Sequence, residues 1–417
     1  MKPVTLLVIG AGSRGAGYAR FALNNPDLAK VVGVAEPREF YRNRMREKHG
    51  IPAENVFTDW REAADRSRFA DAVIVATQDA MHAEPAVAFA GNGYHMLLEK
   101  PMAPNEPDCR RIVEAARAAE IIFAVCHVMR YTVVTRKIKQ LVEAGTIGEV
   151  VSIQHLEPVG YWHQAHSFVR GNWGNEAASS PMLLAKSCHD LDWIRYIIGA
   201  RCTRIASFGT LNHFRAEKKP AGAGARCLDC GIESTCPYSA KKIYLGRVAA
   251  GNTGWPVNVL TPDVTEQGVT EALRTGPYGR CVYACDNDVV DSQVVNMLFE
   301  GGKTASFTMT AFSRMAGRKT TLFGSLGELR RDGAKILHYD FLTDKSEEVD
   351  LGVADQSLAG GHGGGDRGLM QAFVDAVAQN EPSKILSGPE ETLETHLMVF
   401  AAEKARRENS VVEMPPA

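Results

Sequence analysis

The stretch VTLLVIGAGSRGAGYARFALNN, residues 4–25, decides the fold of the first part of the chain. It opens with a short apolar run, which predicts a buried strand, and closes with a pattern typical of a helix. Between the two stand Gly10, Gly12 and Gly15, in the spacing G-x-G-x-x-G. The stretch therefore predicts a strand, a tight turn and a helix.

Each glycine of this turn has a physical role when the turn binds a dinucleotide. Gly10 permits the tight turn, Gly12 lets the backbone approach a pyrophosphate, and Gly15 lets the helix pack closely on the strand. The helix N-terminus offers free N–H groups and a positive dipole end to the phosphates. Ser13 and Arg14 lie in the same turn and join the predicted cofactor-binding residues.

The next apolar run, KVVGVAEP at residues 30–37, ends in Glu36. A carboxylate at this place accepts hydrogen bonds from both ribose hydroxyls of an adenosine, and it would repel a 2′-phosphate. The sequence therefore favours NAD over NADP, although Arg38 softens that preference. The alternative is that Glu36 is a solvated carboxylate at a strand end.

Three more apolar runs follow at residues 71–82, 94–103 and 121–130, with helical patterns between them. Strands that alternate with helices predict an α/β fold, here a doubly wound parallel sheet of the Rossmann type. Ligands of such a sheet bind at the carboxyl ends of its strands. The polar residues at or just after these ends are the candidates Thr77, His82, Glu99, Lys100 and His127. The first three are assigned to the cofactor and His127 to the substrate.

The segments GAGSRG, ATQDAMH and EKPMA resemble, in order and spacing, the Gfo/Idh/MocA oxidoreductases, the glucose–fructose and inositol dehydrogenase group. The resemblance covers the N-terminal domain, which is predicted to span residues 1–127. It implies that Lys100 reaches the sugar hydroxyl beside the nicotinamide. A partly desolvated ammonium at that place positions the hydroxyl and relays its proton, so Lys100 is the first catalytic candidate. The alternative is a surface lysine.

From about residue 128 the pattern changes to a helix and then to long β-rich runs, with a hairpin signal in EGGK at residues 300–303. This predicts an α+β domain over residues 128–417, with an open, mainly antiparallel sheet, as the resemblance also implies. In that family the open face commonly packs against another subunit. A homo-oligomer, dimer or tetramer, is therefore expected by analogy.

The segment SSPMLLAKSCHDLDWIRYIIG, residues 179–199, bears on the reaction. The resemblance implies D-x-x-x-H here, in which both residues bind and deprotonate the sugar. His189 matches, but Ala185 stands at the place of the aspartate and Lys186 follows it. A neutral imidazole suits proton abstraction, so His189 is the predicted base, and Lys186 is predicted to supply a catalytic substrate contact. The alternative is that His189 is a core histidine whose ring nitrogens form hydrogen bonds within the protein.

The stretch GYWHQAHSFVRGNWGN, residues 160–175, reads as a loop rich in aromatic and polar side chains. Sugar sites combine aromatic surfaces with polar donors, and loops on a rigid scaffold often carry them. The substrate-pocket candidates are Trp162, His163, His166, Arg170 and Trp173. Arg170 would suit an anionic group on the substrate. The alternative is simple packing within the loop.

The stretch LAGGHGGGDRGLM, residues 358–370, predicts a lid or a close backbone approach to a ligand, because a glycine run costs backbone entropy. It resembles the G-G-H-G-G stretch of some NAD-dependent glycosidases of the same superfamily. Those enzymes oxidise the 3-hydroxyl, eliminate the aglycone, add water and reduce the ketone again. The resemblance places His362 in the substrate pocket; the alternative is a flexible linker.

A long polar insertion, residues 215 to about 290, contains a group of cysteines. An insertion that buries little apolar surface needs a cross-link to stabilise it, and a zinc ion bound by four thiolates would supply one. The predicted ligands are Cys227, Cys230, Cys236 and Cys281, with Cys285 and His213 as alternatives for the fourth position. The other interpretation is a set of reduced, unliganded thiols.

The net charge and the overall composition limit the classes of function that the sequence allows. The formal charge of the 417 residues is −2, without a basic run, so no nucleic-acid or membrane partner is expected. With no export signal, a cytoplasmic protein is expected. The leading hypothesis is an NAD-dependent oxidoreductase that takes hydride from a secondary hydroxyl, at C3, of a sugar or glycoside. The alternatives are an NAD-dependent glycosidase and a non-catalytic dinucleotide-sensing protein.

Overall fold

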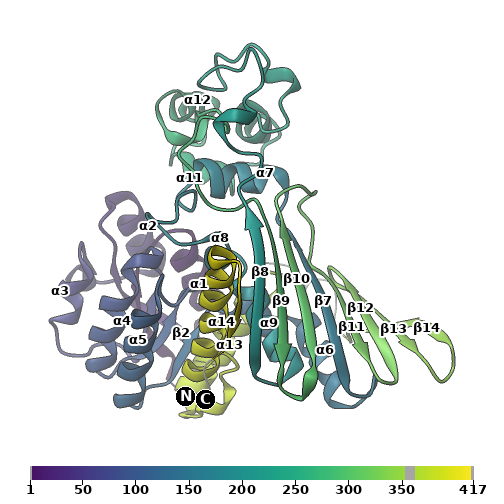
Figure 1. Cartoon of the computed structure of the whole chain (residues 1–417). Helices are drawn as coiled ribbons and strands as arrows, with labels where there is room; N and C mark the ends of the chain where they lie inside the picture. The colour runs from purple at the N-terminus through teal and green to yellow at the C-terminus, as the bar shows by residue number, and fades with distance from the viewer. Residues whose placement is uncertain (1, 353–361, 415–417) are drawn as a thin grey trace.

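The computed structural model describes residues 2–352 and 362–414, and these form two sheets (Figure 1). The first sheet has the strand order β3-β2-β1-β4-β5-β6. Its strands are β1 (Val4–Ile9), β2 (Ala29–Ala35), β3 (Val56–Phe57), β4 (Ala72–Val75), β5 (His95–Leu98) and β6 (Phe123–Val125). Every neighbouring pair is parallel, which confirms the predicted doubly wound sheet.

Helices cover both faces of this sheet. They are α1 (Ser13–Asn24), α2 (Glu39–His49), α3 (Trp60–Ala64), α4 (Ala83–Gly91), α5 (Glu106–Ala118) and α13 (Gly365–Gln379). Along β1, Leu6 packs in one core cluster and Leu7 in another, because successive side chains of a strand point to opposite faces. Phe373 of α13 lies in the Leu6 cluster, so part of the C-terminal chain returns to the first sheet.

The second sheet is mainly antiparallel, as predicted, with the order β14-β13-β12-β11-β7-β10-β9-β8-β15. Its strands are β7 (Val150–Pro158), β8 (Cys202–Thr210), β9 (Ser292–Phe299), β10 (Thr304–Thr310), β11 (Lys319–Gly324), β12 (Gly327–Asp332), β13 (Lys335–Asp340), β14 (Lys345–Glu348) and β15 (Val411–Glu413). One pair, β7 with β10, is parallel. The predicted EGGK hairpin joins β9 to β10, with φ of 75° at Gly301 and 77° at Gly302.

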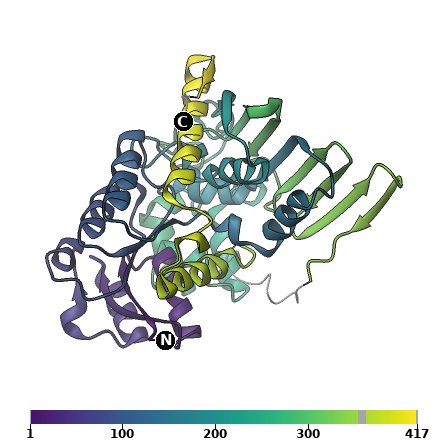
Figure 2. The same ribbon diagram turned by 90° about the horizontal axis from the view of Figure 1, so that it is seen from below.

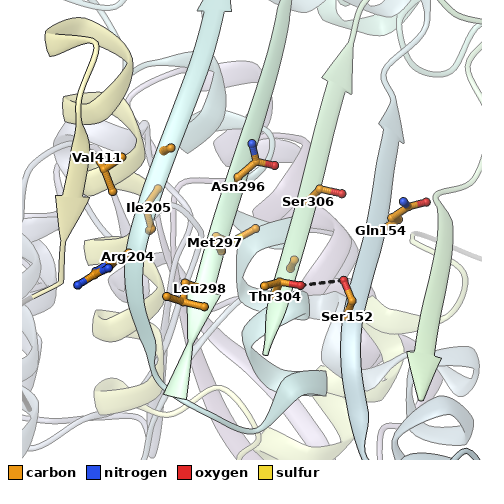
Figure 3. Close-up of a pocket in the computed structure, with 12 residues that line it drawn as sticks. Ser152, Gln154, Arg204, Ile205, Asn296, Met297, Leu298, Thr304, Ser306 and Val411 are labelled. Atoms are coloured by element: carbon orange, nitrogen blue, oxygen red, sulfur yellow. Dashed lines mark hydrogen bonds between the residues drawn. The ribbon is translucent and has the colours of Figure 1, made fainter. Parts of the chain in front are cut away.

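Helices α6 (Val133–Glu143), α9 (Cys188–Ile198) and α14 (Pro389–Glu408) lie on one side of the second sheet. Helix α14 packs against α5 as well as α9 and β8, so it lies between the two sheets (Figure 2). The other face is open and carries a hollow of about 400 Å³, where Ser152, Asn296 and Ser306 project from neighbouring strands (Figure 3).

The insertion folds around its own small core at one end of the second sheet (Figure 1). Tyr244, Val269 and Leu273 are fully buried there. The expectation that this segment buries little apolar surface is therefore wrong, because its helices pack on one another. They are η7 (Lys241–Leu245), α10 (Gly246–Ala249), α11 (Val257–Leu260) and α12 (Glu266–Thr275).

Short helical turns complete the described chain. They are η1 (Ala53–Asn55), η2 (Asp79–Met81), η3 (Val128–Tyr131), α7 (Tyr161–His163), η4 (Gln164–Arg170), α8 (Met182–Ala185), η5 (Ala216–Lys218), η6 (Glu233–Thr235), η8 (Pro277–Gly279), η9 (Glu300–Gly302) and η11 (Pro382–Lys384). Over residues 2–352 and 362–414, none of the helices has the length and apolar character that a membrane crossing requires.

Candidate functional site

The glycine turn between β1 and α1 leaves no room for side chains. Gly10 has φ of +89°, and a Cβ there would lie 2.5 Å from the carbonyl oxygen of Ala76. A Cβ on Gly15 would lie 1.9 Å from the carbonyl oxygen of Gly10. Helix α1 has Gly12 at its N-cap, without a side-chain cap, and Ser13 is exposed as its first residue. The free N–H groups and the bare backbone fit a pyrophosphate.

Glu36 lies against this turn at the end of β2. Its Oε2 accepts a hydrogen bond from the N–H of Ala11 at 2.9 Å, and its Oε1 accepts one from Nε of Arg38 at 2.7 Å. Burial opposes ionisation of Glu36, but the hydrogen bonds from Arg38 and Ala11 outweigh it and lower the pKa. An ionised carboxylate beside the glycine turn fits the ribose of an NAD molecule, so these residues match the predicted cofactor.

Arg14 joins the glycine turn to two other segments. Its guanidinium lies 2.5 Å from Glu99 and 2.8 Å from Asp366 of α13, and it also contacts the Tyr18 hydroxyl. Glu99 and Arg14 were both predicted to bind the cofactor. The structure engages them with each other, so their observed role is to hold the turn, β5 and α13 together.

The segment after β5 presents Lys100. The backbone N–H of Lys100 donates to Oε2 of Glu99 at 2.6 Å, and its Nζ donates to the carbonyl oxygen of Ala185 at 2.7 Å. Ala185 ends helix α8, so a residue of the first sheet reaches the second part of the chain. The ammonium is therefore bound to the backbone of Ala185, which precedes His189 by four residues.

His82 and Thr77 support this segment from the neighbouring strand end. The ring nitrogens of His82 lie 2.8 Å from the carbonyl oxygen of Pro101 and 3.3 Å from that of Thr77. His82 is only 1% exposed. Its ring joins two backbone segments, and its assignment to the cofactor stays a prediction. The hydroxyl of Thr77 donates within its own turn, to the carbonyl oxygen of Met81.

His189 lies in the first turn of α9 and is 4% exposed. Burial, followed by the positive charge of Lys100, lowers its pKa well below the ordinary value. Its Nδ1 has no hydrogen-bond partner among the described residues. The ring centroid lies 5.9 Å from that of His362 and 5.6 Å from that of His127. A neutral imidazole is the form that accepts a proton.

His127 is fully buried, and its assignment to the substrate stays a prediction. Burial is the largest cause that lowers its pKa to about 3. Its Nδ1 lies 3.7 Å from Asp192, which is itself paired with Arg130 at 2.7 Å. His127 therefore packs behind His189.

Lys186 enters a buried ion network that the sequence did not predict. Its Nζ lies 2.9 Å from Glu157, which also lies 2.9 Å from Arg318. Arg318 pairs in turn with Asp190 at 2.7 Å, and Asp190 with His155 at 3.0 Å. One feature of the sequence could have indicated this network. His155 and Glu157 alternate with outward-facing residues of β7, and so lie on the same buried face as Ile153. Arg318 precedes β11 and had no local signal.

Residues 160–175 are not the predicted loop but contain two helical turns, α7 and the π-helical η4. His166 is bonded to the Tyr244 hydroxyl at 2.9 Å and is 2% exposed. Arg170 is 3% exposed and donates to the carbonyl oxygens of Arg280 and Tyr238. These side chains anchor the insertion, and their contact with a substrate stays a prediction.

The other three candidates of this segment keep access to solvent. Trp162 and His163 are half-buried, and both rings pack against Trp255 of the insertion. Burial, then the charge of Lys186, lowers the pKa of His163 well below its ordinary value. Trp173 is exposed and donates from Nε1 to Asp79, in the turn after β4, at 3.2 Å.

His362 is brought to the same region, beside His189. Its Nδ1 lies 3.2 Å from Asp366, the partner of Arg14. Burial opposes ionisation of Asp366, but the hydrogen bonds from His362 and Arg14 lower its pKa. The preceding part of the glycine-rich stretch, residues 358–361, lies outside the described residues.

The zinc prediction is not supported by the geometry. Over residues 2–352 and 362–414, no group of three or more His, Cys, Asp or Glu side chains is arranged to hold a metal ion. The predicted ligands Cys227, Cys230, Cys236 and Cys281 line one pocket, and two of their sulfurs accept hydrogen bonds from different donors. Sγ of Cys227 accepts from Arg170 and Sγ of Cys230 from the N–H of Gly224, both at 3.4 Å. The insertion is held by its own core and by Arg170.

Comparisons with known proteins agree with this geometry. The family described as "Oxidoreductase family, NAD-binding Rossmann fold" matches residues 4–127, and "Oxidoreductase family, C-terminal alpha/beta domain" matches residues 139–414. YteT of Bacillus subtilis, which is named as an oxidoreductase, is 25% identical over 77% of this chain and 76% of its own length. The 2,7-anhydro-N-acetylneuraminate hydratase of Escherichia coli is 32% identical over 46% of this chain and 49% of its own length.

Among solved structures, the fold resembles that of the WlbA dehydrogenase from Bordetella pertussis, in complex with NADH and UDP-GlcNAcA. The TM-score is 0.71 and the identity 14%, over 100% of this chain and 99% of the other. At that identity the likeness concerns the fold alone. The two family matches cover most of the chain, and they include the glycine turn, Lys100 and His189. The chain therefore belongs to the Gfo/Idh/MocA family of NAD-binding oxidoreductases.

Proposed function

We propose that this protein oxidises a secondary hydroxyl of a sugar or glycoside, at C3, with NAD as the cofactor. The observation that carries the proposal is the meeting of Lys100 and His189 across the two parts of the chain. The ammonium is held by the carbonyl of Ala185, and its charge helps to keep the buried imidazole neutral. Bound NAD supplies the hydride acceptor.

The two side chains divide the work at the hydroxyl. Lys100 donates a hydrogen bond to the hydroxyl oxygen and stabilises the negative charge that grows there as the proton leaves. His189 accepts the hydroxyl proton on its unpartnered Nδ1 or on its other ring nitrogen. Trp162, His163 and Trp173 are the proposed side chains around the sugar, because they combine aromatic surface with access to solvent.

The proposal is tested with purified protein, NAD and a panel of sugars, inositols and glycosides, by following absorbance at 340 nm. We expect NADH in proportion to the substrate consumed, and loss of this signal in His189→Asn. A His189→Asn protein with full activity would overturn the assignment of the base. A wild-type protein that binds NAD and oxidises no member of the panel would favour a dinucleotide sensor.

A second candidate function is redox-neutral cleavage or hydration of a glycoside. In it, the transient 3-ketone acidifies the neighbouring C–H, the leaving group is eliminated, water adds, and the ketone is reduced again. The position of His362 beside His189 favours it, because elimination needs an acid or base besides the one that serves the hydroxyl. The relative named as an anhydro-sugar hydratase gives it further support. Release of the leaving group without net NADH would identify this reaction.

We also propose that the protein is a homo-oligomer that packs through the open face of the second sheet. Phe208 and Val411 are each 63% exposed on β8 and β15. The hollow between Val411 and β7 suits a neighbouring copy (Figure 3). Sedimentation velocity of the wild type and of Asn296→Arg tests the assembly. A wild-type monomer, or an unchanged oligomer in the variant, would contradict it.

A further inference from the structure

Three consecutive residues, Lys100, Pro101 and Met102, each have one backbone group bound by a different buried side chain. The N–H of Lys100 donates to Glu99, and the carbonyl oxygen of Pro101 contacts His82. The N–H of Met102 donates to Nε2 of His396, at 2.8 Å. Glu99 directly follows β5 and His82 follows the turn η2 after β4, whereas His396 comes from α14. The third contact therefore ties this segment to the C-terminal helix.

The partners of His396 determine which of its nitrogens carries the proton. Nδ1 lies 2.8 Å from the carbonyl oxygen of Thr392, which can only accept, so Nδ1 is the donor. Nε2 is then unprotonated and accepts the N–H of Met102. Both His396 and Met102 are fully buried, so no water competes for these bonds. The imidazole is thus a fixed acceptor for one backbone N–H.

His396 also lies at the end of a row of imidazoles that leads to the proposed base. Its ring centroid is 5.6 Å from that of His127, which is 5.6 Å from that of His189. The same turn of α14 contributes Thr395, whose hydroxyl donates to Asp192 at 3.1 Å. Helix α14 thereby supports the segment that carries Lys100 and the helix that carries His189.

We infer that His396 is a positioning residue for Lys100 in the proposed oxidation: its Nε2 holds Met102 so that the Lys100 ammonium meets the substrate hydroxyl. The kinetic consequence rests on the proposed function. Displacement of a reacting group by about 1 Å can cost on the order of 10²-fold in rate. Loss of the acceptor should therefore affect turnover rather than the binding of NAD, whose glycine turn is held by other contacts.

A pair of variants separates the hydrogen bond from mere filling of space. In His396→Gln the side-chain oxygen extends toward the place of Nε2 and restores an acceptor for Met102. In His396→Asn the amide nitrogen takes the place of Nδ1 and restores only the donor to Thr392. We expect kcat of the glutamine variant within about threefold of wild type, and kcat of the asparagine variant and of His396→Leu reduced about 10- to 100-fold. KM for NAD should stay within about twofold in all three.

His95→Leu is a matched control for the loss of such a bond. Nδ1 of His95 accepts the N–H of Ile122 at 3.0 Å, at the opposite end of β5 from Lys100. This variant loses the same kind of contact away from the reaction, so its kcat should equal that of the wild type. Equal losses in His396→Gln and His396→Asn, or an unchanged kcat in a folded His396→Leu, would overturn the inference.

Two measurements do not depend on knowing the substrate. The first is amide hydrogen exchange at Met102, which should be at least about tenfold faster in the asparagine and leucine variants than in wild type and the glutamine variant. The second is acetylation of Lys100 by an N-hydroxysuccinimide ester, compared with Lys186 in the same protein. The Lys100 rate should change in the same two variants while the Lys186 rate stays constant. If the wild type oxidises no sugar, the proposed function fails, and unchanged exchange and labelling would independently overturn the role of His396.

Discussion

The Nζ of Lys100 lies 2.7 Å from the carbonyl oxygen of Ala185, so the first sheet and helix α8 meet at the residue that stands where an aspartate was expected. The partner of the ammonium is a backbone carbonyl, which carries no formal charge. It orients the lysine without adding a negative charge beside His189. This contact is the basis for the first prediction.

Replacement of Lys100 by methionine should reduce kcat by about 10²-fold or more, because a positioned acid or hydrogen-bond donor contributes on that scale. The affinity for NADH, measured by fluorescence titration, should stay within a few-fold of wild type. Lys186→Met is the comparison. Glu157 keeps Arg318 as its partner in that variant, so the buried carboxylate is not left unpaired and the loss should be smaller. Equal losses in both variants would contradict the separation of roles.

His362→Ala should distinguish the two candidate reactions. If the protein is a net dehydrogenase, the variant should retain most of its rate of NADH formation. If the reaction is redox-neutral, release of the leaving group should fall by about 10²-fold, while oxidation, followed in a single turnover, should persist. Asp366→Asn is not an equivalent test, because Asp366 also pairs with Arg14 beside the glycine turn. A His362→Ala variant that loses the oxidation step itself would contradict both assignments.

Glu36→Ala should shift the cofactor preference. The carboxylate is expected to bind the ribose hydroxyls of NAD, so its loss should raise KM for NAD by about tenfold, the equivalent of roughly 1.4 kcal/mol. Arg38 would be released from its contacts with Glu36 and become available to a 2′-phosphate, so KM for NADP should fall. The double variant Glu36→Ala with Arg38→Ala should lose that gain. An unchanged ratio of the two KM values would refute the assigned role of Glu36.

Stability should decrease as the pH falls from about 6.5 to 4. Burial is the largest cause that lowers the pKa of His127 and His166 to about 3 and of His396 to about 4. The unfolded chain binds protons at these residues near pH 6.5 and the folded chain does not, so acid favours unfolding. Each of the three should cost about 1.4 kcal/mol at pH 5.5 relative to a pH above 7.

Urea denaturation at pH 7.5 and 5.5 measures this effect. His166→Gln provides the control, because its neutral amide does not titrate and the free energy of unfolding should then depend less on pH. An unfolding free energy that stays constant between these two pH values would rule out the buried neutral histidines as a source of acid sensitivity.

Much of the fold followed from short-range patterns in the sequence. The strand period, the spacing of Gly10, Gly12 and Gly15, and the EGGK hairpin are local features, because neighbouring residues alone determine them. The two sheets could therefore be predicted, together with Glu36, Lys100 and His189 at their element ends. The partners of long-range contacts could not be predicted, because no short segment of the sequence indicates which distant residue will contact it. Met102 and His396 are 294 residues apart, and Arg14 and Asp366 are 352 apart.

The sequence by itself determined the class of fold, the glycine turn and the two candidate groups of the reaction. Only the tertiary structure decided which polar residues are buried and which retain access to solvent. His82, His127, His166 and Arg170 have the side chains of a binding site, yet each is buried and engaged or enclosed within the protein. Burial depends on what the rest of the chain packs against a residue, and that is a property of the folded molecule rather than of any short segment.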